Sequence, residues 1–244
     1  MAKAIRVNNV YQQNIIKLLR ELTDRYTTWQ VWQDFITMAA VCIANVFYHP
    51  HKAANEKLYA GIAQKYTDKE LDIFARMLQE VIDGLEADPE QDFLGTLFMG
   101  LDLGNEWRGQ FFTPYDVCRA MAAMNVTEKP KKQIADQGWI NVHDPACGAG
   151  ALLVAFANAC KNAGINYQRH ALFVAQDIDQ LAGLMCYIQI SLLGCAGYVV
   201  IQDTLRYPIL VMDERGLVPL DNGNIWYTPM YYSDTWEVRK IKTI

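Results

Sequence analysis

Apolar residues follow a helical period through the first part of the chain. In residues 9–105 they recur at intervals of three and four positions, as in residues 11–26, which predicts amphipathic helices. Residues 29–47 are apolar on nearly every side, so we expect a buried helix there. The capping box Thr-Asp-Lys-Glu at residues 67–70 predicts the start of a further helix, which we expect Gly84 to end.

The pattern changes near residue 139, where short β-branched runs begin to alternate with helical ones. A strand, a helix, a strand, a helix and a strand are predicted in turn, at residues 140–143, 151–160, 171–175, 181–193 and 198–201. Such β-α-β spacing with short connections is typical of a parallel, doubly wound sheet. We therefore expect an α/β fold in which an all-helical N-terminal region, residues 1–105, precedes an α/β domain, residues 106–244.

The connection after the first predicted strand is the most informative stretch of the sequence. Residues 142–153 read Val-His-Asp-Pro-Ala-Cys-Gly-Ala-Gly-Ala-Leu-Leu, which indicates a strand, a tight turn and a helix start. Gly148 and Gly150 allow positive φ angles and a close approach of the backbone to a ligand. A dinucleotide-binding turn would have a third glycine where Leu153 stands. Because Asp144 places an acid before the glycines, the turn suits a cationic ligand such as S-adenosylmethionine better than a pyrophosphate.

A second string upstream of this turn strengthens the interpretation. Residues 109–114 read Gly-Gln-Phe-Phe-Thr-Pro, and with Asp-Pro-Ala-Cys-Gly-x-Gly at residues 144–150 the chain resembles the adenine-N6 DNA methyltransferases, specifically the methylation subunits of type I restriction-modification systems. The resemblance covers roughly residues 90–205, with Ala149 where the family usually has serine. It implies a class I methyltransferase-like, Rossmann-like sheet that binds S-adenosylmethionine. The residues that it assigns to the cofactor in these two strings are Gln110, Phe111, Phe112, Thr113, Pro114, Asp144, Pro145, Ala146, Cys147, Gly148 and Gly150.

Two further acids follow the next two predicted strands. Asp177 is placed to accept from the ribose hydroxyls, as the equivalent acid does in dinucleotide folds, and Ile178 beside it could lie against the adenine ring. Asp203 and Leu205 match the Gly-Asp-Thr-Leu string of the family, which implies an acceptor for the exocyclic amine of the cofactor. Each acid alone could equally cap a helix or a turn, as we expect of Asp179.

The catalytic string of the family departs from its pattern in this chain. The family has Asn-Pro-Pro-Tyr or Asn-Pro-Pro-Phe, which holds the target amine and stacks on the flipped base, whereas residues 228–231 read Thr-Pro-Met-Tyr. The resemblance makes Thr228, Pro229 and Tyr231 the catalytic candidates. The other interpretation, an edge hairpin with aromatic packing, remains open. The sequence ends at Ile244, before the rest of the family's sheet and the region that contacts DNA, so we expect a truncated domain.

Charge and composition limit the remaining possibilities. The net charge of −5 does not indicate a dedicated DNA-binding surface. If DNA is the substrate, we therefore expect a partner to make much of the contact with it. Six cysteines without a Cys-x-x-Cys pair indicate free thiols, and His49 and His51 lack further ligands at metal spacing. The longest apolar run, residues 35–48, is too short for a bilayer, and no secretion signal is recognisable. We expect a cytoplasmic protein without a metal or a membrane association.

Three functions are consistent with the sequence. The first is an S-adenosylmethionine-dependent DNA adenine-N6 methyltransferase of the restriction-modification type, active alone or together with a specificity subunit or a second methyltransferase subunit. The second is a catalytically inactive relative that binds the cofactor and acts as a regulatory or assembly subunit. The third is a methyltransferase for a substrate other than DNA. Cytosine-C5 transfer is disfavoured because the sequence has no Pro-Cys pair.

Overall fold

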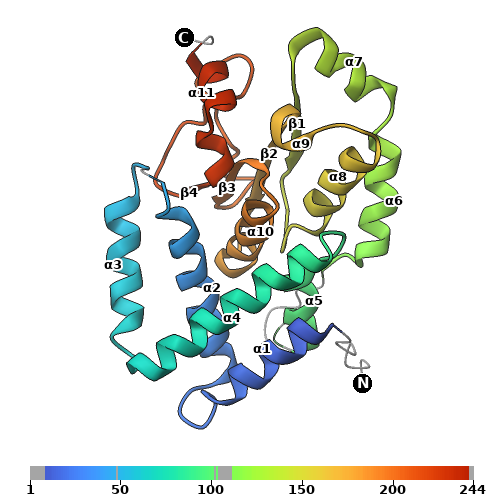
Figure 1. The fold of residues 1–244 in the computed structure, drawn as a ribbon. Helices are drawn as coiled ribbons and strands as arrows, with labels where there is room; N and C mark the ends of the chain where they lie inside the picture. Colours follow the sequence, from blue (N-terminus) through green and yellow to red (C-terminus); the bar gives the residue numbers. More distant parts are fainter. Residues whose placement is uncertain (1–8, 48, 102, 104–111, 242–244) are drawn as a thin grey trace.

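The computed structural model describes residues 9–47, 49–101, 103 and 112–241. Helices surround a small central sheet, and the first and last described helices lie at opposite ends of the molecule (Figure 1). The helices are α1 (Val10–Arg20), α2 (Thr28–Ala44), α3 (Lys52–Ala63), α4 (Asp68–Ala87), α5 (Phe93–Gly100), α6 (Tyr115–Asn125), α7 (Glu128–Gln137), α8 (Ala151–Asn162), α9 (Tyr167–His170), α10 (Gln180–Leu192), the 3₁₀ helix η1 (Pro229–Tyr232) and α11 (Asp234–Ile241). The strands are β1 (Ile140–Asp144), β2 (Ala171–Asp177), β3 (Ala196–Ile201) and β4 (Ile225–Tyr227).

The described residues of the N-terminal region are helical, as the sequence predicts. The capping box at Thr67 is formed and opens α4. The prediction that Gly84 ends this helix is wrong, because α4 continues to Ala87. Gly84 serves packing instead, since a Cβ there would lie 2.3 Å from the ring of Phe93. The next helix begins at Phe93 behind its cap, Asp92.

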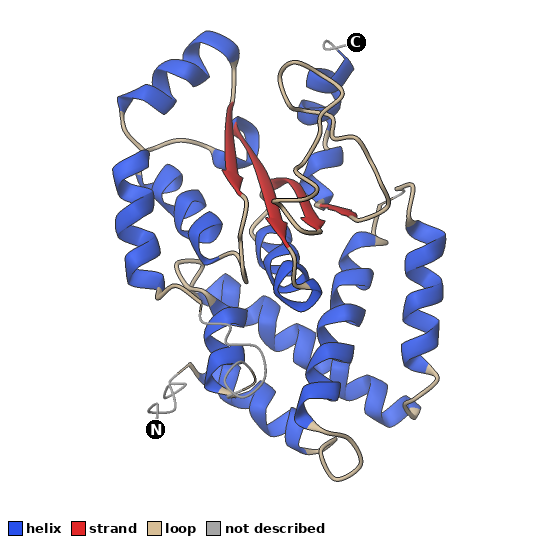
Figure 2. Cartoon of the chain, turned by 180° about the vertical axis from the view of Figure 1, so that it is seen from behind, coloured by secondary structure: helices blue, strands red, loops and turns tan. Residues whose placement is uncertain are grey.

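The sheet has the order β1-β2-β3-β4, and its first three strands are parallel (Figure 2). The α/β fold class is therefore as predicted. The connecting helices α8 and α10 both pack on one face of the sheet, as right-handed crossovers in one direction require. The opposite face is covered by η1, α11 and the segment that leads to β4. The short strand β4 runs antiparallel to β3 at the edge of the sheet remote from β1.

One hydrophobic core joins the helical region to the sheet. It combines side chains of α1, α2, α4 and α5 with those of α8, α10 and the three parallel strands. Helix α10 lies between the sheet and α2, so that both of its sides are buried. The boundary expected at residues 105 and 106 falls outside the described residues.

The edge strand β1 and the central strand β2 differ in exposure. All of β2 except its last residue is buried, whereas β1 exposes Asn141 and His143. Within the part of the chain that the structure describes, β1 pairs with β2 alone. The turn that follows β1 therefore lies at an accessible edge. None of the described helices combines the length and the apolar character needed to cross a membrane.

Candidate functional site

A glycine turn connects β1 to α8 and presses closely against α10. Gly148 and Gly150 have φ angles of +53° and +94°, in the region that favours glycine. A Cβ at Gly150 would lie 2.8 Å from the Sγ atom of Cys186. The Gly150 amide donates a hydrogen bond of 2.8 Å to the carbonyl oxygen of Cys147, which closes the turn. The predicted strand, turn and helix start are all present.

Two carboxylates hold this turn from neighbouring strand ends. Asp144, at the end of β1, accepts a hydrogen bond of 3.1 Å from the Ala146 amide. Asp177, at the end of β2, accepts through Oδ2 from the Gly148 amide at 2.8 Å and through Oδ1 from the Asp179 amide at 2.9 Å. Since a carboxylate offers about four acceptor positions, Asp177 keeps capacity for further donors.

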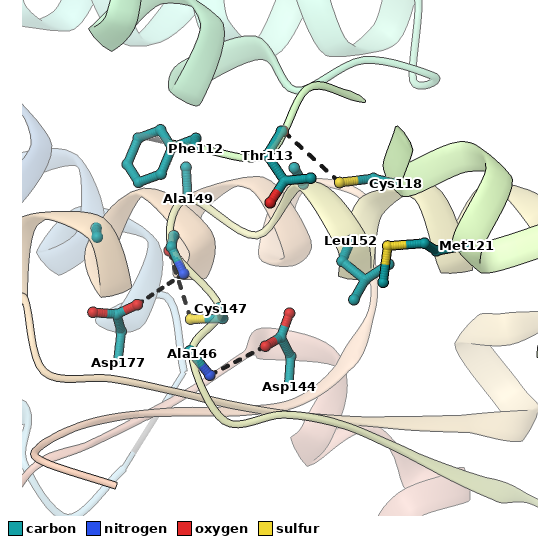
Figure 3. A pocket seen from close by; sticks show the side chains of 13 residues that line it. Phe112, Thr113, Cys118, Met121, Asp144, Ala146, Cys147, Ala149, Leu152 and Asp177 are labelled. Carbon is teal, nitrogen blue, oxygen red and sulfur yellow. Dashed lines mark hydrogen bonds between the residues drawn. The ribbon is translucent and has the colours of Figure 1, made fainter. Parts of the chain in front are cut away.

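A cavity of about 340 Å³ opens over the turn, a size within the usual range for small-molecule sites. Asp144 and Asp177 approach it from the sheet side, and Phe112 and Thr113 from the opposite side (Figure 3). The Phe112 ring rests on the turn, because a Cβ on Gly148 would lie 3.0 Å from it. The lining consists of Phe112, Thr113, Cys118, Met121, Asp144, Ala146, Cys147, Gly148, Ala149, Ala151, Leu152, Asp177 and Ala182.

The structure brings the central part of the sequence prediction into this cavity. The predicted residues that line it are Phe112, Thr113, Asp144, Ala146, Cys147, Gly148 and Asp177. The predicted residues outside the lining are Pro114, Pro145, Gly150, Ile178, Asp203 and Leu205. Gln110 and Phe111 lie outside the described residues. Sequence reasoning missed an apolar wall made by Cys118 and Met121 of α6 and by Leu152 of α8. The helical spacing of 118 and 121 was the signal that could have found it.

Asp203 and its neighbours form a turn beside the cavity. The Asp203 carboxylate accepts from the amides of Leu205 and Arg206, at 3.0 and 3.2 Å. This is the turn-capping role that the sequence left open. The hydroxyl of Thr204 donates a hydrogen bond of 2.7 Å to the carbonyl oxygen of Pro145, so the segment after β3 lies against the glycine turn. Asp179 caps α10 through the Ala182 amide at 2.9 Å, as expected.

The electrostatics of the cavity favour a cation. Burial raises the pKa of the Asp144 carboxyl, and the nearby Asp177 carboxylate raises it further, against the opposing effects of the Ala146 amide and His143. A positive charge beside Asp144 would offset this cost. A hydrogen bond with Cys186 and burial raise the pKa of the Cys147 thiol well above its ordinary value, so Cys147 is not a nucleophile at neutral pH.

The residues of the Thr-Pro-Met-Tyr string do not reach this cavity. Thr228 is fully buried, and its hydroxyl accepts from the Gly197 amide at 3.0 Å and donates to the Gly197 carbonyl at 3.2 Å. Pro229 opens η1. Tyr231 is buried, donates to the carbonyl of Leu217 at 2.7 Å and stacks on Tyr227. These contacts agree with the interpretation of the segment as an edge strand with aromatic packing.

A metal centre is not indicated by the residues that can be placed. Within residues 9–47, 49–101, 103 and 112–241, no group of three or more His, Cys, Asp or Glu side chains could hold an ion. His51 instead pairs with Asp221, with 2.8 Å between Nε2 and Oδ2.

Comparisons with known proteins identify the family of the chain. The sequence profile of the N-6 DNA methylase family matches residues 103–241. Among solved structures, the chain is similar to a Listeria monocytogenes protein described as a class I S-adenosylmethionine-dependent methyltransferase, with 16% sequence identity and a TM-score of 0.44. That alignment covers 84% of this chain, which spans 56% of the other protein. A search of curated proteins gives no match.

Proposed function

Because the chain belongs to the N-6 DNA methylase family, with S-adenosylmethionine as its cofactor, we propose that it binds this cofactor in the cavity over the glycine turn and serves in methyl transfer to adenine N6 of DNA. The observation that carries the proposal is the placement of Asp144 and Asp177 at the ends of adjacent parallel strands, on one cavity. Ligands of open α/β sheets bind at the carboxyl ends of the strands.

The residues present suit this cofactor. Asp144 is a partly desolvated carboxylate that a sulfonium or ammonium group would stabilise. Asp177 has acceptor capacity left for the ribose hydroxyls, and Ile178, 70% exposed beside it, offers an apolar surface for the adenine ring. When bound, the cofactor supplies an electrophilic methyl group on sulfur. Asp144, Asp177 and Ile178 would bind the cofactor and orient its methyl group at the edge of the sheet.

The proposal also extends to the biological role of the protein and to its partner subunit. We propose a restriction-modification role in the cytoplasm, in which a specificity subunit or a second methyltransferase subunit supplies much of the contact with DNA. The net charge of −5 and the internal hydrogen bonds of Thr228 and Tyr231 support the need for a partner. The division into a helical region, residues 1–105, and a methyltransferase-like domain, residues 106–244, is part of the same proposal.

The test of cofactor binding is calorimetric titration of the purified chain with S-adenosylmethionine. We expect one site per chain and a loss of about 10-fold to 100-fold in affinity in Asp177→Ala, which removes a charged hydrogen-bond acceptor. Asp213→Ala is the matched control, because Asp213 also accepts from two backbone amides, those of Leu217 and Val218, away from the cavity. Equal affinities in wild type and Asp177→Ala would refute the site.

The test of the reaction is transfer of a labelled methyl group to DNA, with and without candidate partner subunits. Label in N6-methyladenine supports the proposed reaction. Cofactor binding without transfer to any DNA, whatever partner is added, would instead establish an inactive regulatory or assembly subunit. Label that appears only on RNA, protein or a small molecule would identify a methyltransferase for another substrate.

A further inference from the structure

One side-chain amide in α10 connects three separate parts of the chain. Gln189 is fully buried, and its Oε1 atom accepts a hydrogen bond of 3.1 Å from the Leu94 amide. Its Nε2 atom donates to Oδ1 of Asp92 at 2.9 Å and to the carbonyl oxygen of Ala149 at 2.8 Å. Both amide protons of this side chain are therefore used inside the protein.

The bond to Ala149 reaches the centre of the glycine turn. Ala149 stands between Gly148 and Gly150, the two residues with positive φ angles. Glycines lose more conformational entropy on ordering than other residues, so a turn with two of them needs contacts from outside to keep one conformation. The Gln189 amide supplies such a contact from α10.

The other end of this connection is well fixed. Asp92 is buried and caps α5 by accepting from the Gly95 amide at 3.0 Å. Burial raises the pKa of the Asp92 carboxyl, and the hydrogen bonds from Gln189 and Gly95 oppose this effect. A Cβ at Gly95 would lie 2.1 Å from Oδ2 of Asp92. Any larger residue at position 95 would therefore collide with the Asp92 carboxyl.

Helix α5 also contacts the turn by a second route. Phe98 of α5 packs against Phe112, with 5.6 Å between the ring centroids. Phe112 rests in turn on Gly148. Helix α5 therefore supports the turn indirectly, through Gln189 at Ala149 and through Phe112 at Gly148.

We propose that Gln189 is a positioning residue for the cofactor, which holds the glycine turn in its binding conformation against α5 of the helical region. The identity of the ligand rests on the proposed function. The conformation of the glycine turn in the ligand-free protein is independent of the proposed function and can be measured separately.

The test uses Gln189→Met, which keeps the volume of the side chain and removes its hydrogen bonds. We expect faster amide hydrogen exchange at residues 146–152 of the ligand-free protein and an affinity for S-adenosylmethionine that is about 10-fold weaker. Both are measured well below the melting temperature, so that the folded fraction is unchanged. Gln189→Asn, which withdraws the amide by about one C–C bond length of ~1.5 Å, is the milder variant if Gln189→Met does not fold.

Gln12→Met is the matched control. Gln12 is also a buried glutamine, and it donates to the carbonyl oxygen of Phe93 at 2.7 Å without contacting the turn. We expect this variant to lose stability while its exchange at residues 146–152 and its cofactor affinity stay those of the wild type. Unchanged exchange at the turn in both Gln189 variants would overturn the positioning role. If the wild type binds no cofactor, the proposed function fails, and the exchange measurement alone decides the role of Gln189.

Discussion

Two segments of this chain carry family-like motifs, and they differ in what their polar groups contact. At the glycine turn, Asp144 and Asp177 line a cavity and hold acceptor positions that none of the described residues is seen to use. In the segment after β4, the hydroxyls of Thr228 and Tyr231 are buried and bonded to backbone groups. Of two motifs that resemble the same family, one thus lines the cavity proposed to bind the cofactor and the other is part of the hydrophobic core.

The pairing of the strands explains this difference. The parallel strands β1 and β2 deliver their ends, and therefore both acids, to the same edge of the sheet. Strand β4 runs antiparallel beside β3, so that its end is buried under η1 and α11. Four substitutions, taken from the largest expected effect to the smallest, test whether the two segments differ in function as they do in structure.

Gly150→Ala is expected to have the largest effect. The substituted residue would keep a φ of +94°, which costs about 1–2 kcal/mol for an L-residue, and its Cβ would lie 2.8 Å from the Sγ atom of Cys186. We expect a loss of about 3 kcal/mol in the free energy of unfolding and of about 100-fold in cofactor affinity. Denaturant unfolding and calorimetry measure the two quantities.

Gly164→Ala is the control for backbone strain. Gly164 has a φ of +76°, and a Cβ there would meet nothing within 4 Å. It should cost about 1 kcal/mol of stability and leave the affinity unchanged. Normal cofactor binding by Gly150→Ala would mean that the turn does not have to press against α10.

Thr228→Val tests the buried segment. It replaces the hydroxyl by a methyl group of similar size and removes the acceptor of the Gly197 amide, while the Gly197 carbonyl keeps its bond of 2.9 Å from the Thr228 amide. We expect a loss of about 2 kcal/mol in the free energy of unfolding, with no change in cofactor affinity. Thr23→Val is the matched control, because the Thr23 hydroxyl donates to the carbonyl oxygen of Arg20 in the turn after α1, at 2.9 Å, and does not line the cavity. Weaker cofactor binding by Thr228→Val would remove the distinction between the two segments.

Asp144→Asn is expected to weaken S-adenosylmethionine binding about 10-fold, or about 1.4 kcal/mol. Because burial raises the pKa of Asp144, the ionised carboxyl is unfavourable in the folded protein, and the melting temperature should rise slightly in the variant. Asp116→Asn is the control, since it makes the same change of charge on a side chain that is 93% exposed. Calorimetry and thermal unfolding separate the two effects.

The same raised pKa determines a pH dependence. The cationic cofactor requires ionised Asp144, so the affinity of the wild type should fall as the pH falls through the pKa of Asp144, at a pH above the ordinary aspartate value of 3.8. The stability contribution has the opposite sign, because protonation of a group with a raised pKa relieves the cost of burying its charge. An Asp144→Asn variant with an unchanged pH profile of affinity would assign the titration to another group.

Tyr231→Phe is expected to have the smallest effect. It removes the bond from the Tyr231 hydroxyl to Leu217 and keeps the ring stacked on Tyr227, so we expect a loss of about 1 kcal/mol. Cofactor affinity and methyl transfer to DNA by the assembled protein should not change. A stable Tyr231→Phe protein that has lost transfer would restore Tyr231 as a catalytic candidate.

Local signals in the sequence were sufficient for the glycine turn. The β-branched run before Asp144, the two glycines and the apolar run after them each determine a structure within a few residues. The acid at Asp177 could be placed for the same reason, because it ends a strand whose residues are nearly all buried. The helical spacing of residues 118 and 121 puts their side chains on one helix face, but that this face lines the cavity depends on how α6 packs on α8.

Elements without a distinctive pattern were not predicted. Helix α7 has no buried residue, so its sequence carries no apolar period. Helix α11 buries Trp236 alone and lies in a region where the helical signal had ended. Strand β4 pairs antiparallel with β3, although a long segment of the chain separates the two strands. Such a pairing depends on contacts between residues far apart in the sequence, which no local pattern encodes.

The shared core also has a consequence for how the chain is made. Helix α2, with most of its residues buried, leaves the ribosome before its main packing partner, α10. The chain from Asn45 to Asp179 is synthesised in between, which takes on the order of 10 s at about 5–20 residues per second. For that time the face of α2 that packs on α10 has no partner, although α1, α3 and α4 are already available to cover its other faces. Chaperone binding during translation should therefore concentrate on α2 and end when α10 emerges.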